Sequence, residues 1–176
     1  MEKLLAVTAI GTDRAGLVRD LSHTISTAGG NILESRMTTL GSEFAVLMLV
    51  AGNWHAISKV EESLTSLGES SDLTINVRAT EAHPGEEAAA PYTVDVIALD
   101  QEGIVAGLSN FFSSRSLTIA DLNTRLYNAP HTGSAMFSVQ MTISIPRSTH
   151  LATLREEFHE YCESQNLDAV IEPAQR

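Results

Sequence analysis

The chain has 176 residues, an apolar fraction of 43% and a formal net charge of -11 at pH 7. The apolar fraction is typical of a globular protein with a buried core. The acidic balance argues against direct binding to duplex DNA, because no cluster of Lys and Arg can form the cationic face that phosphate contacts require.

The sequence also indicates a compartment. No apolar run reaches the roughly 18 residues that cross a bilayer, and the N-terminal residues lack the pattern of a signal peptide. The single cysteine, Cys162, has no partner for an internal disulfide. We therefore expect a cytoplasmic protein with no membrane partner and no direct nucleic-acid partner.

Hydrophobic periodicity predicts six elements in the first half of the chain. Alternating residues indicate strands at 3–10, 31–40, 43–51 and 72–79, and helical spacing indicates helices at 17–28 and 54–67. Asn53 is a plausible N-cap for the second helix, Trp54 is expected to anchor it in the core, and Gly68 is expected to end it. The predicted order is β-α-β-β-α-β.

The same order then restarts. Residues 82–90 read as a linker, which places a first domain at 1–81 and a second at 91–176. The second set has strands at 92–99, 118–127, 135–145 and 167–171, a helix starting at Ile104, and a last helix capped by Ser148 or Thr149. Identical residues recur 87 positions apart, from Val7, Asp13, Gly16, Leu21, Ser22, Ser26 and Ile32 to Val94, Asp100, Gly103, Leu108, Ser109, Ser113 and Ile119.

This pattern predicts an α+β fold made of two ferredoxin-like repeats. In each repeat, two helices would cover one face of an antiparallel sheet and leave the other face bare. A bare face and an open edge strand are usually covered. We therefore expect the other repeat or another copy of the chain to cover them, which suggests a homo-oligomer.

The turn at 11–18, between the first strand and the first helix, is the strongest candidate site. Backbone N–H groups at a helix start have no partner within the helix, and the helix dipole favours an anion there. Asp13 is expected to cap the helix, and Gly16 allows close approach of a ligand or of another backbone. The alternative is that this turn serves folding alone.

The residues Asp13-Arg14-x-Gly16-Leu17-Val18 and Gly30-Asn31-Ile32, within this β-α-β-β-α-β order, resemble the ACT domain. The resemblance covers residues 3–80 well and 91–172 more loosely. ACT domains are regulatory modules, and many bind amino acids between paired domains. The resemblance implies a ligand site at Asp13, Arg14, Gly16, Leu17 and Asn31. The amides of Gly16 and Leu17 would hold the carboxylate, while Asp13 and the Asn31 carbonyl would accept from the ammonium group.

The run from Ser35 to Ile57 narrows the resemblance to tandem ACT repressors that have no DNA-binding domain. Such a repressor restrains a DNA-binding activator protein, and glycine relieves the restraint. The resemblance therefore implies a non-enzymatic regulator with a small amino acid as ligand, glycine being suspected, and with no cofactor.

A weaker second site is expected at Asp100, Gly103, Ile104 and Thr118 in the second repeat. Thr118 stands where the first repeat has Asn31, and Glu102 beside Gly103 would repel a carboxylate. A purely structural role for this turn is the alternative.

Two other function classes are less well supported. His159 and Cys162 are spaced for one helix face, but two metal ligands without a third make a weak site. An enzyme on the same scaffold, such as a phosphate-ester hydrolase, would need a base or an anion-binding arginine in the loop, and Arg14 alone qualifies. A ligand-free ACT module for protein interaction or dimerisation stays the main alternative to an amino-acid sensor.

Overall fold

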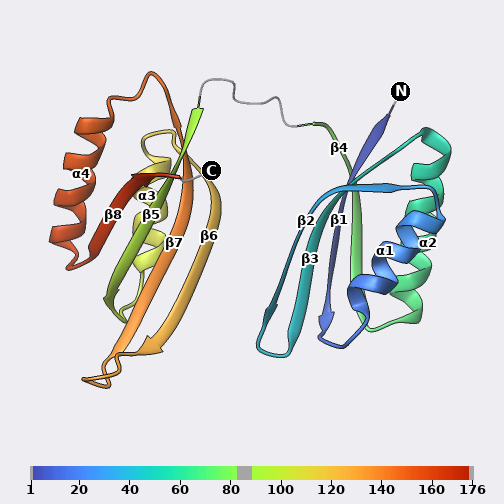
Figure 1. Ribbon diagram of the computed structural model, residues 1–176, viewed down its shortest axis with the longest axis horizontal. Helices are drawn as coiled ribbons and strands as arrows, with labels where there is room; N and C mark the ends of the chain where they lie inside the picture. The colour runs from blue at the N-terminus through green and yellow to red at the C-terminus, as the bar shows by residue number, and fades with distance from the viewer. Residues whose placement is uncertain (1, 83–88, 175–176) are drawn as a thin grey trace. The chain divides into compact units, whose positions relative to one another are not determined.

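The computed structural model describes residues 2–82 and 89–174, and the chain divides into two compact units, Met1–Pro84 and Gly85–Arg176. They are called unit 1 and unit 2 below and are described separately. In each unit, two helices cover one face of a four-stranded sheet (Figure 1). Within the described residues, no helix is both long enough and apolar enough to cross a membrane.

Unit 1 contains β1 (Lys3–Thr12), α1 (Leu17–Thr27), β2 (Asn31–Leu40), β3 (Glu43–Gly52), α2 (Trp54–Ser70) and β4 (Leu73–Thr80). The strand order across the sheet is β2-β3-β1-β4, and all neighbours are antiparallel. Alternate residues of β1, among them Leu5, Val7 and Ala9, are buried under the helices, as expected for a sheet covered on one side.

Unit 2 repeats this arrangement with β5 (Ala89–Leu99), α3 (Ile104–Ser113), β6 (Thr118–Asn128), β7 (Ala135–Pro146), α4 (Leu151–Ser164) and β8 (Asp168–Pro173). Its strand order is β6-β7-β5-β8. The core contains a group of aromatic rings in which Phe111, Phe112 and Phe158 lie with centroids 5.2 Å apart.

The predicted α+β class and the repeated β-α-β-β-α-β order are confirmed. Most boundaries agree within one or two residues, and the largest differences are of three residues: β5 begins at Ala89 instead of residue 92, and α2 ends at Ser70 instead of residue 67. Of the predicted linker at 82–90, residues 83–88 lie outside the described part of the chain, and residues 89 and 90 belong to β5.

Three predictions about α2 and α4 are wrong. Trp54 is 68% exposed and lies under the Lys3 ammonium group, because the first turn of α2 carries it beyond the core while Ile57, Val60 and Leu64 are buried. Gly68 does not end α2, which continues to Ser70. The N-cap of α4 is His150, not Ser148 or Thr149.

Candidate ligand-binding corner

The turn between β1 and α1 is fastened to the hairpin that joins β2 and β3. The backbone N–H of Asp13 donates a hydrogen bond of 2.8 Å to the carbonyl oxygen of Ser42. Thr12 adds a hydrogen bond of 3.1 Å from its hydroxyl to the carboxylate of Asp72. These contacts hold the turn between two loops at one end of the unit 1 sheet, and we call residues 12–20 the unit 1 corner.

Gly16 sets the backbone geometry of this corner. It is the N-cap of α1 and has a left-handed conformation with φ 93°. Glycine adopts this conformation without the steric cost that a Cβ atom brings. No side chain caps the helix, so the prediction that Asp13 caps α1 is wrong. The reason is its position, since a capping side chain belongs to the N-cap residue itself and Asp13 lies three residues earlier.

The helix start presents backbone donors. The first bond of α1 runs from the Asp20 N–H to the Gly16 carbonyl oxygen, at 2.9 Å. The N–H groups of Leu17, Val18 and Arg19 precede that bond and have no acceptor within the helix. Together with the positive end of the helix dipole, they suit a carboxylate. Asp13 is exposed beside them.

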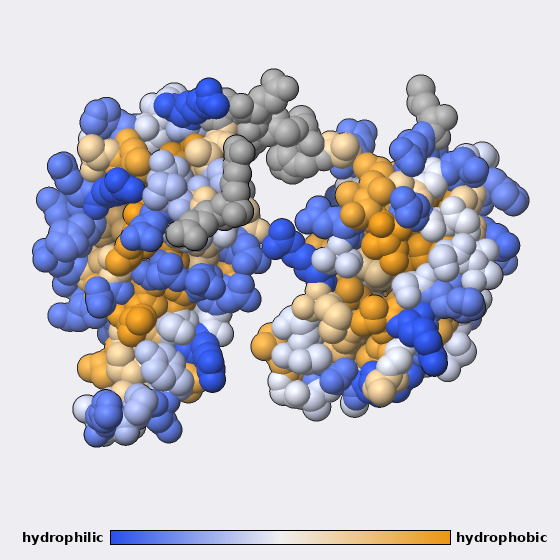
Figure 2. All heavy atoms as spheres, in the orientation of Figure 1, coloured by the Kyte–Doolittle hydropathy of each residue, from blue (hydrophilic) through white to orange (hydrophobic). Residues whose placement is uncertain are grey.

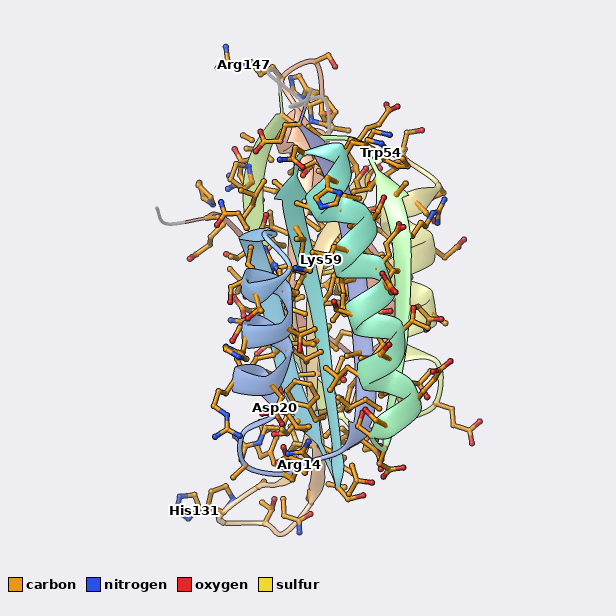
Figure 3. All side chains as sticks on the ribbon, turned by 90° about the vertical axis from the view of Figure 1, so that its right-hand side faces the viewer. Arg14, Asp20, Trp54, Lys59, His131 and Arg147 are labelled. Carbon is orange, nitrogen blue, oxygen red and sulfur yellow. The ribbon has the colours of Figure 1, made fainter. Side chains whose placement is uncertain are left out.

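Two guanidinium groups flank this helix start. Arg14 lies 3.1 Å from one carboxylate oxygen of Asp20, and Arg19 lies 2.9 Å from the other. Both arginines lie near the carboxylate at the beginning of α1, and Figure 3 shows Arg14 and Asp20 at this end of the unit. Hydrogen bonds from Arg19 and then from Arg14 lower the pKa of Asp20 below its ordinary value.

Arg19 and Asp20 are members of the corner that the motif did not predict. Only Arg14 belongs to the ACT-like motif, and its contact with Asp20 spans the turn and the first residues of the helix. The available signal was the Arg19-Asp20 pair directly after the motif.

The structure does not bring Asn31 to the corner within unit 1. Asn31 begins β2 and is in register with Ala51, which is in turn paired with Leu4 at the start of β1. The corner follows Thr12 at the other end of β1, so α1, with its 11 residues, separates the two. A helix of that length spans about 16 Å, which exceeds the size of a small amino acid.

Asn31 instead lies at one end of a groove between α1 and β2. The groove is lined by Arg19, Ser22, His23, Ile25, Ser26, Gly30, Asn31 and Ile32. Most of these side chains are polar, and Arg19 links the groove to the corner. Asp13 and Asn31 both belong to unit 1, so a single small ligand can contact both residues only if they come from two copies of the chain.

Unit 2 has the same backbone corner but different side chains. Gly103 is the N-cap of α3 with φ 85°, and the Asp100 N–H donates to the Ala135 carbonyl oxygen at 2.9 Å. Gln101 stands where unit 1 has Arg14, and its side chain donates to the backbone of Gln165 at 3.2 Å.

Gly107 replaces the acidic partner Asp20, and Glu102 is exposed at the turn, so no arginine of the unit 2 corner offsets its carboxylates. Ile104 is buried as the first residue of α3. Thr118 begins β6 in register with Ser144, at the end of the sheet away from Gly103. Among the residues that the structure describes, unit 1 alone therefore combines free helix-start amides with neighbouring guanidinium groups.

The structure offers little support for a metal site or a reactive thiol. His159 pairs with Glu163 at 3.2 Å, while Cys162 is buried, and burial raises the pKa of its thiol to about 11. In the part of the chain that the structure covers, no group of three or more His, Cys, Asp or Glu residues is arranged to hold a metal ion.

Comparison with known proteins identifies the family. The ACT domain model matches residues 3–78. The glycine cleavage system transcriptional repressor of Escherichia coli strain K12 is 32% identical over 167 residues, which cover 95% of this chain and 88% of that protein.

Two solved structures match over nearly the whole chain. A crystal structure assigned to a glycine cleavage system transcriptional repressor has a TM-score of 0.78 and 27% identity, and covers 100% of this chain and 99% of its own. A protein of Galdieria sulphuraria described as unknown has a TM-score of 0.82 at 23% identity, covers 99% of this chain and 100% of its own, and supports the fold alone. The chain belongs to the family of glycine cleavage system transcriptional repressors, which are ACT-domain regulators and not enzymes.

Proposed function

We propose that this protein represses expression of the glycine cleavage system by binding a DNA-binding activator protein, and that glycine relieves this repression. Family membership supports the repressor role, and the net charge of -11 supports action through a protein instead of direct contact with DNA. We place this activity in the cytoplasm, where the activator and its genes would be found.

The observation that carries the ligand proposal is the geometry of the unit 1 corner. The α-carboxylate of glycine would accept from the free amides at the start of α1, with Arg14 and Arg19 nearby, and its ammonium group would lie against Asp13. Glycine has no side chain, so recognition of its two charged groups suffices to hold it.

Asn31 would join this site from a second copy of the chain. Because α1 separates Asn31 from the corner of its own unit and unit 2 has Thr118 at that position, one copy would supply the amides and Asp13 while the other would supply the Asn31 carbonyl. A ligand held between two copies would bind one arrangement of them more tightly than another. Glycine would thereby shift the population of arrangements and change the surface that the activator meets.

Ligand binding is tested by calorimetric titration of the full chain with glycine, alanine, serine and leucine. We expect heat from glycine, and a rise in the thermal unfolding midpoint in its presence. Asp13→Ala is expected to abolish both signals. Asp100→Ala, which changes the corresponding residue of unit 2, is the matched control and is expected to leave glycine binding unchanged.

The second candidate is a ligand-free ACT module that serves protein interaction. The observation in its favour is that the corner also has a folding role, since it fastens β1 to the β2–β3 hairpin through the Asp13–Ser42 bond. Absence of heat and of a midpoint shift with every amino acid tested would support this candidate and contradict the glycine proposal.

The partner is tested by capture from a lysate of the native host, with and without glycine. We expect an activator of glycine cleavage genes in the captured fraction and less of it when glycine is present. In a retardation assay with duplex DNA, the protein alone should cause no shift at near-physiological salt.

A further inference from the structure

The two units have matching interiors but different open sheet faces. On the side covered by helices, Val7, Phe44 and Met48 of unit 1 correspond to Val94, Phe137 and Met141 of unit 2. Residues directly opposite each other in a sheet share a face, and successive residues alternate. The pairing registers therefore define the open face of each unit, the face turned away from its helices.

The open face of unit 1 is apolar along its two central strands. β3 presents Ala45, Leu47 and Leu49 there, and β1 presents Ala6 and Ile10. Leu47 is 51% exposed and Ile10 is 49% exposed, although both belong to central strands. Figure 2 shows hydrophobic residues reaching the surface beside the strands of this unit. A face of this kind favours a dry interface.

The open face of unit 2 is polar at most of the same positions, the exception being Ile97, which corresponds to Ile10. Ser138, Gln140 and Thr142 replace the three apolar residues of β3, and Asp95 replaces Thr8. The side-chain amide of Gln140 donates to the Asp95 carboxylate at 2.9 Å. The central strands of the two open faces therefore differ in polarity, and unit 1 has the more apolar face.

The geometry points to a two-fold interface in which the open face of unit 1 packs against the open face of unit 1 from a second copy of this chain. A polar sheet face such as that of unit 2 is a poor cover for Leu47 and Leu49, because burial would remove its serine, threonine and carboxylate groups from water opposite apolar side chains. The same apolar face of a second copy can cover these residues without this cost of desolvation. A two-fold interface also requires a surface that complements itself.

One pair of edge charges on the unit 1 face meets this requirement, although Glu34 also lies 3.6 Å from Arg36 of its own strand. One row across the sheet reads Glu34 on β2, Leu49 on β3, Ala6 on β1 and Arg78 on β4. A two-fold axis parallel to the strands reverses the strand order and keeps each row at its level. It thus places Glu34 of each copy opposite Arg78 of the other, with the apolar residues between them.

The available area is sufficient for a stable dimer. Four strands at about 4.8 Å spacing and about 30 Å of length give a flat footprint of roughly 570 Å² per copy, or about 1,100 Å² for both. Side chains make the buried surface larger than this footprint. A specific interface needs about 1,000 Å² in total.

The apolar part of the proposed interface is tested by replacing its residues with those at the corresponding positions of unit 2. Leu47→Gln/Leu49→Thr gives β3 the side chains that the corresponding strand of unit 2, β7, has at these positions, so the fold should be retained. In sedimentation equilibrium of the full chain, we expect dimers for the native protein and a dissociation constant raised about 100-fold or more in this variant. Ile10→Gln should weaken association, whereas the matched unit 2 variant Ile97→Gln should leave it unchanged.

The charged part is tested by exchange, which does not disturb the core. Glu34→Arg and Arg78→Glu should each weaken the dimer, and the double variant should restore it to within about threefold of the native constant, because the opposed charges are then exchanged but still complementary. A native chain that is monomeric at 100 μM, an unchanged constant in Leu47→Gln/Leu49→Thr, an equal loss in Ile97→Gln, or no rescue by the double charge variant would each overturn the inference.

Discussion

Substitution of Gly16 by alanine is the most direct probe of the unit 1 corner. The added Cβ atom would lie 3.4 Å from a terminal nitrogen of Arg19, a flexible group, so the cost is conformational and not a clash. An L-residue at φ +93° loses about 1–2 kcal/mol, and the reduced entropy of the unfolded chain returns about 0.4–1 kcal/mol. We expect a net loss of about 1 kcal/mol from the free energy of unfolding of unit 1.

The measurement is urea unfolding followed by far-ultraviolet circular dichroism and by the fluorescence of Trp54, the single tryptophan, which lies in unit 1. For a domain of this size, about 1 kcal/mol corresponds to a midpoint lower by roughly 4–8 °C in a thermal scan. Gly16→Asn should recover part of the loss, because asparagine tolerates the left-handed conformation better than alanine. A Gly16→Ala variant as stable as the native protein would refute the reasoning.

Gly103→Ala is the matched control for ligand binding. Gly103 has φ 85° and open space around it, so its substitution should cost unit 2 about as much. The two variants should differ in glycine affinity, which should fall only in Gly16→Ala. An equal fall in both would place ligand recognition in both corners or in neither.

Three further predictions concern Asp20, Gly11 and Cys162. Asp20→Asn removes the negative charge that both corner arginines contact. Because folding lowers the pKa of Asp20, the stabilisation by its carboxylate is present above about pH 4 and is lost as the pH falls through the lowered pKa. Native and variant stabilities measured from pH 7 to pH 2.5 should therefore converge in acid. Gly11→Ala should destabilise unit 1 by about 2 kcal/mol or more in urea unfolding, since its Cβ would meet the backbone carbonyl oxygen of Asp72. Cys162 should resist a thiol reagent at pH 8 in the native protein and react after addition of urea, because it is buried and its pKa is raised to about 11.

The repeated fold was predictable because two independent signals agree. Alternation along each strand marks the residues that face the helices, and the 87-residue offset repeats the same interior at Val7 and Val94. Both signals depend on burial, which constrains every inward position. The order of elements and the buried face of each sheet were therefore accessible before the structure.

Predictions failed where position within an element decides the outcome. Trp54 has the spacing of the buried stripe of α2, but it lies in the first turn, beyond the residues that pack on the sheet. Asp13 has a capping side chain, yet the left-handed Gly16 takes the cap position. Periodicity describes faces of a helix and does not show where the helix meets the core or turns away from it.

The backbone geometry of the candidate site was predictable from the sequence, but the set of residues that lie together at the site was not. The motif around Gly16 identified the helix start, but the distance from it to Asn31 depends on α1 as a rigid spacer. Two residues of one motif can bind the same ligand from two copies of a chain. The sequence does not distinguish this case from a pocket within one copy. The Arg14–Asp20 contact escaped notice because it joins a turn to a helix face.

Comparison of the two units separates folding from function at the corner. Gly16 and Gly103 share a left-handed backbone, and the bond from Asp13 to Ser42 has a counterpart from Asp100 to Ala135, so these features follow from the shared fold.

Arg14, Arg19 and Asp20 of the unit 1 corner have no charged counterpart in unit 2, where Gln101, Ala106 and Gly107 stand at these positions. A feature that one copy of a fold omits without loss of that fold is not needed for folding. The charged groups that flank the amides of α1 therefore fit the proposed role of unit 1 as the ligand-binding unit, and the contrast between Gly16→Ala and Gly103→Ala tests that role.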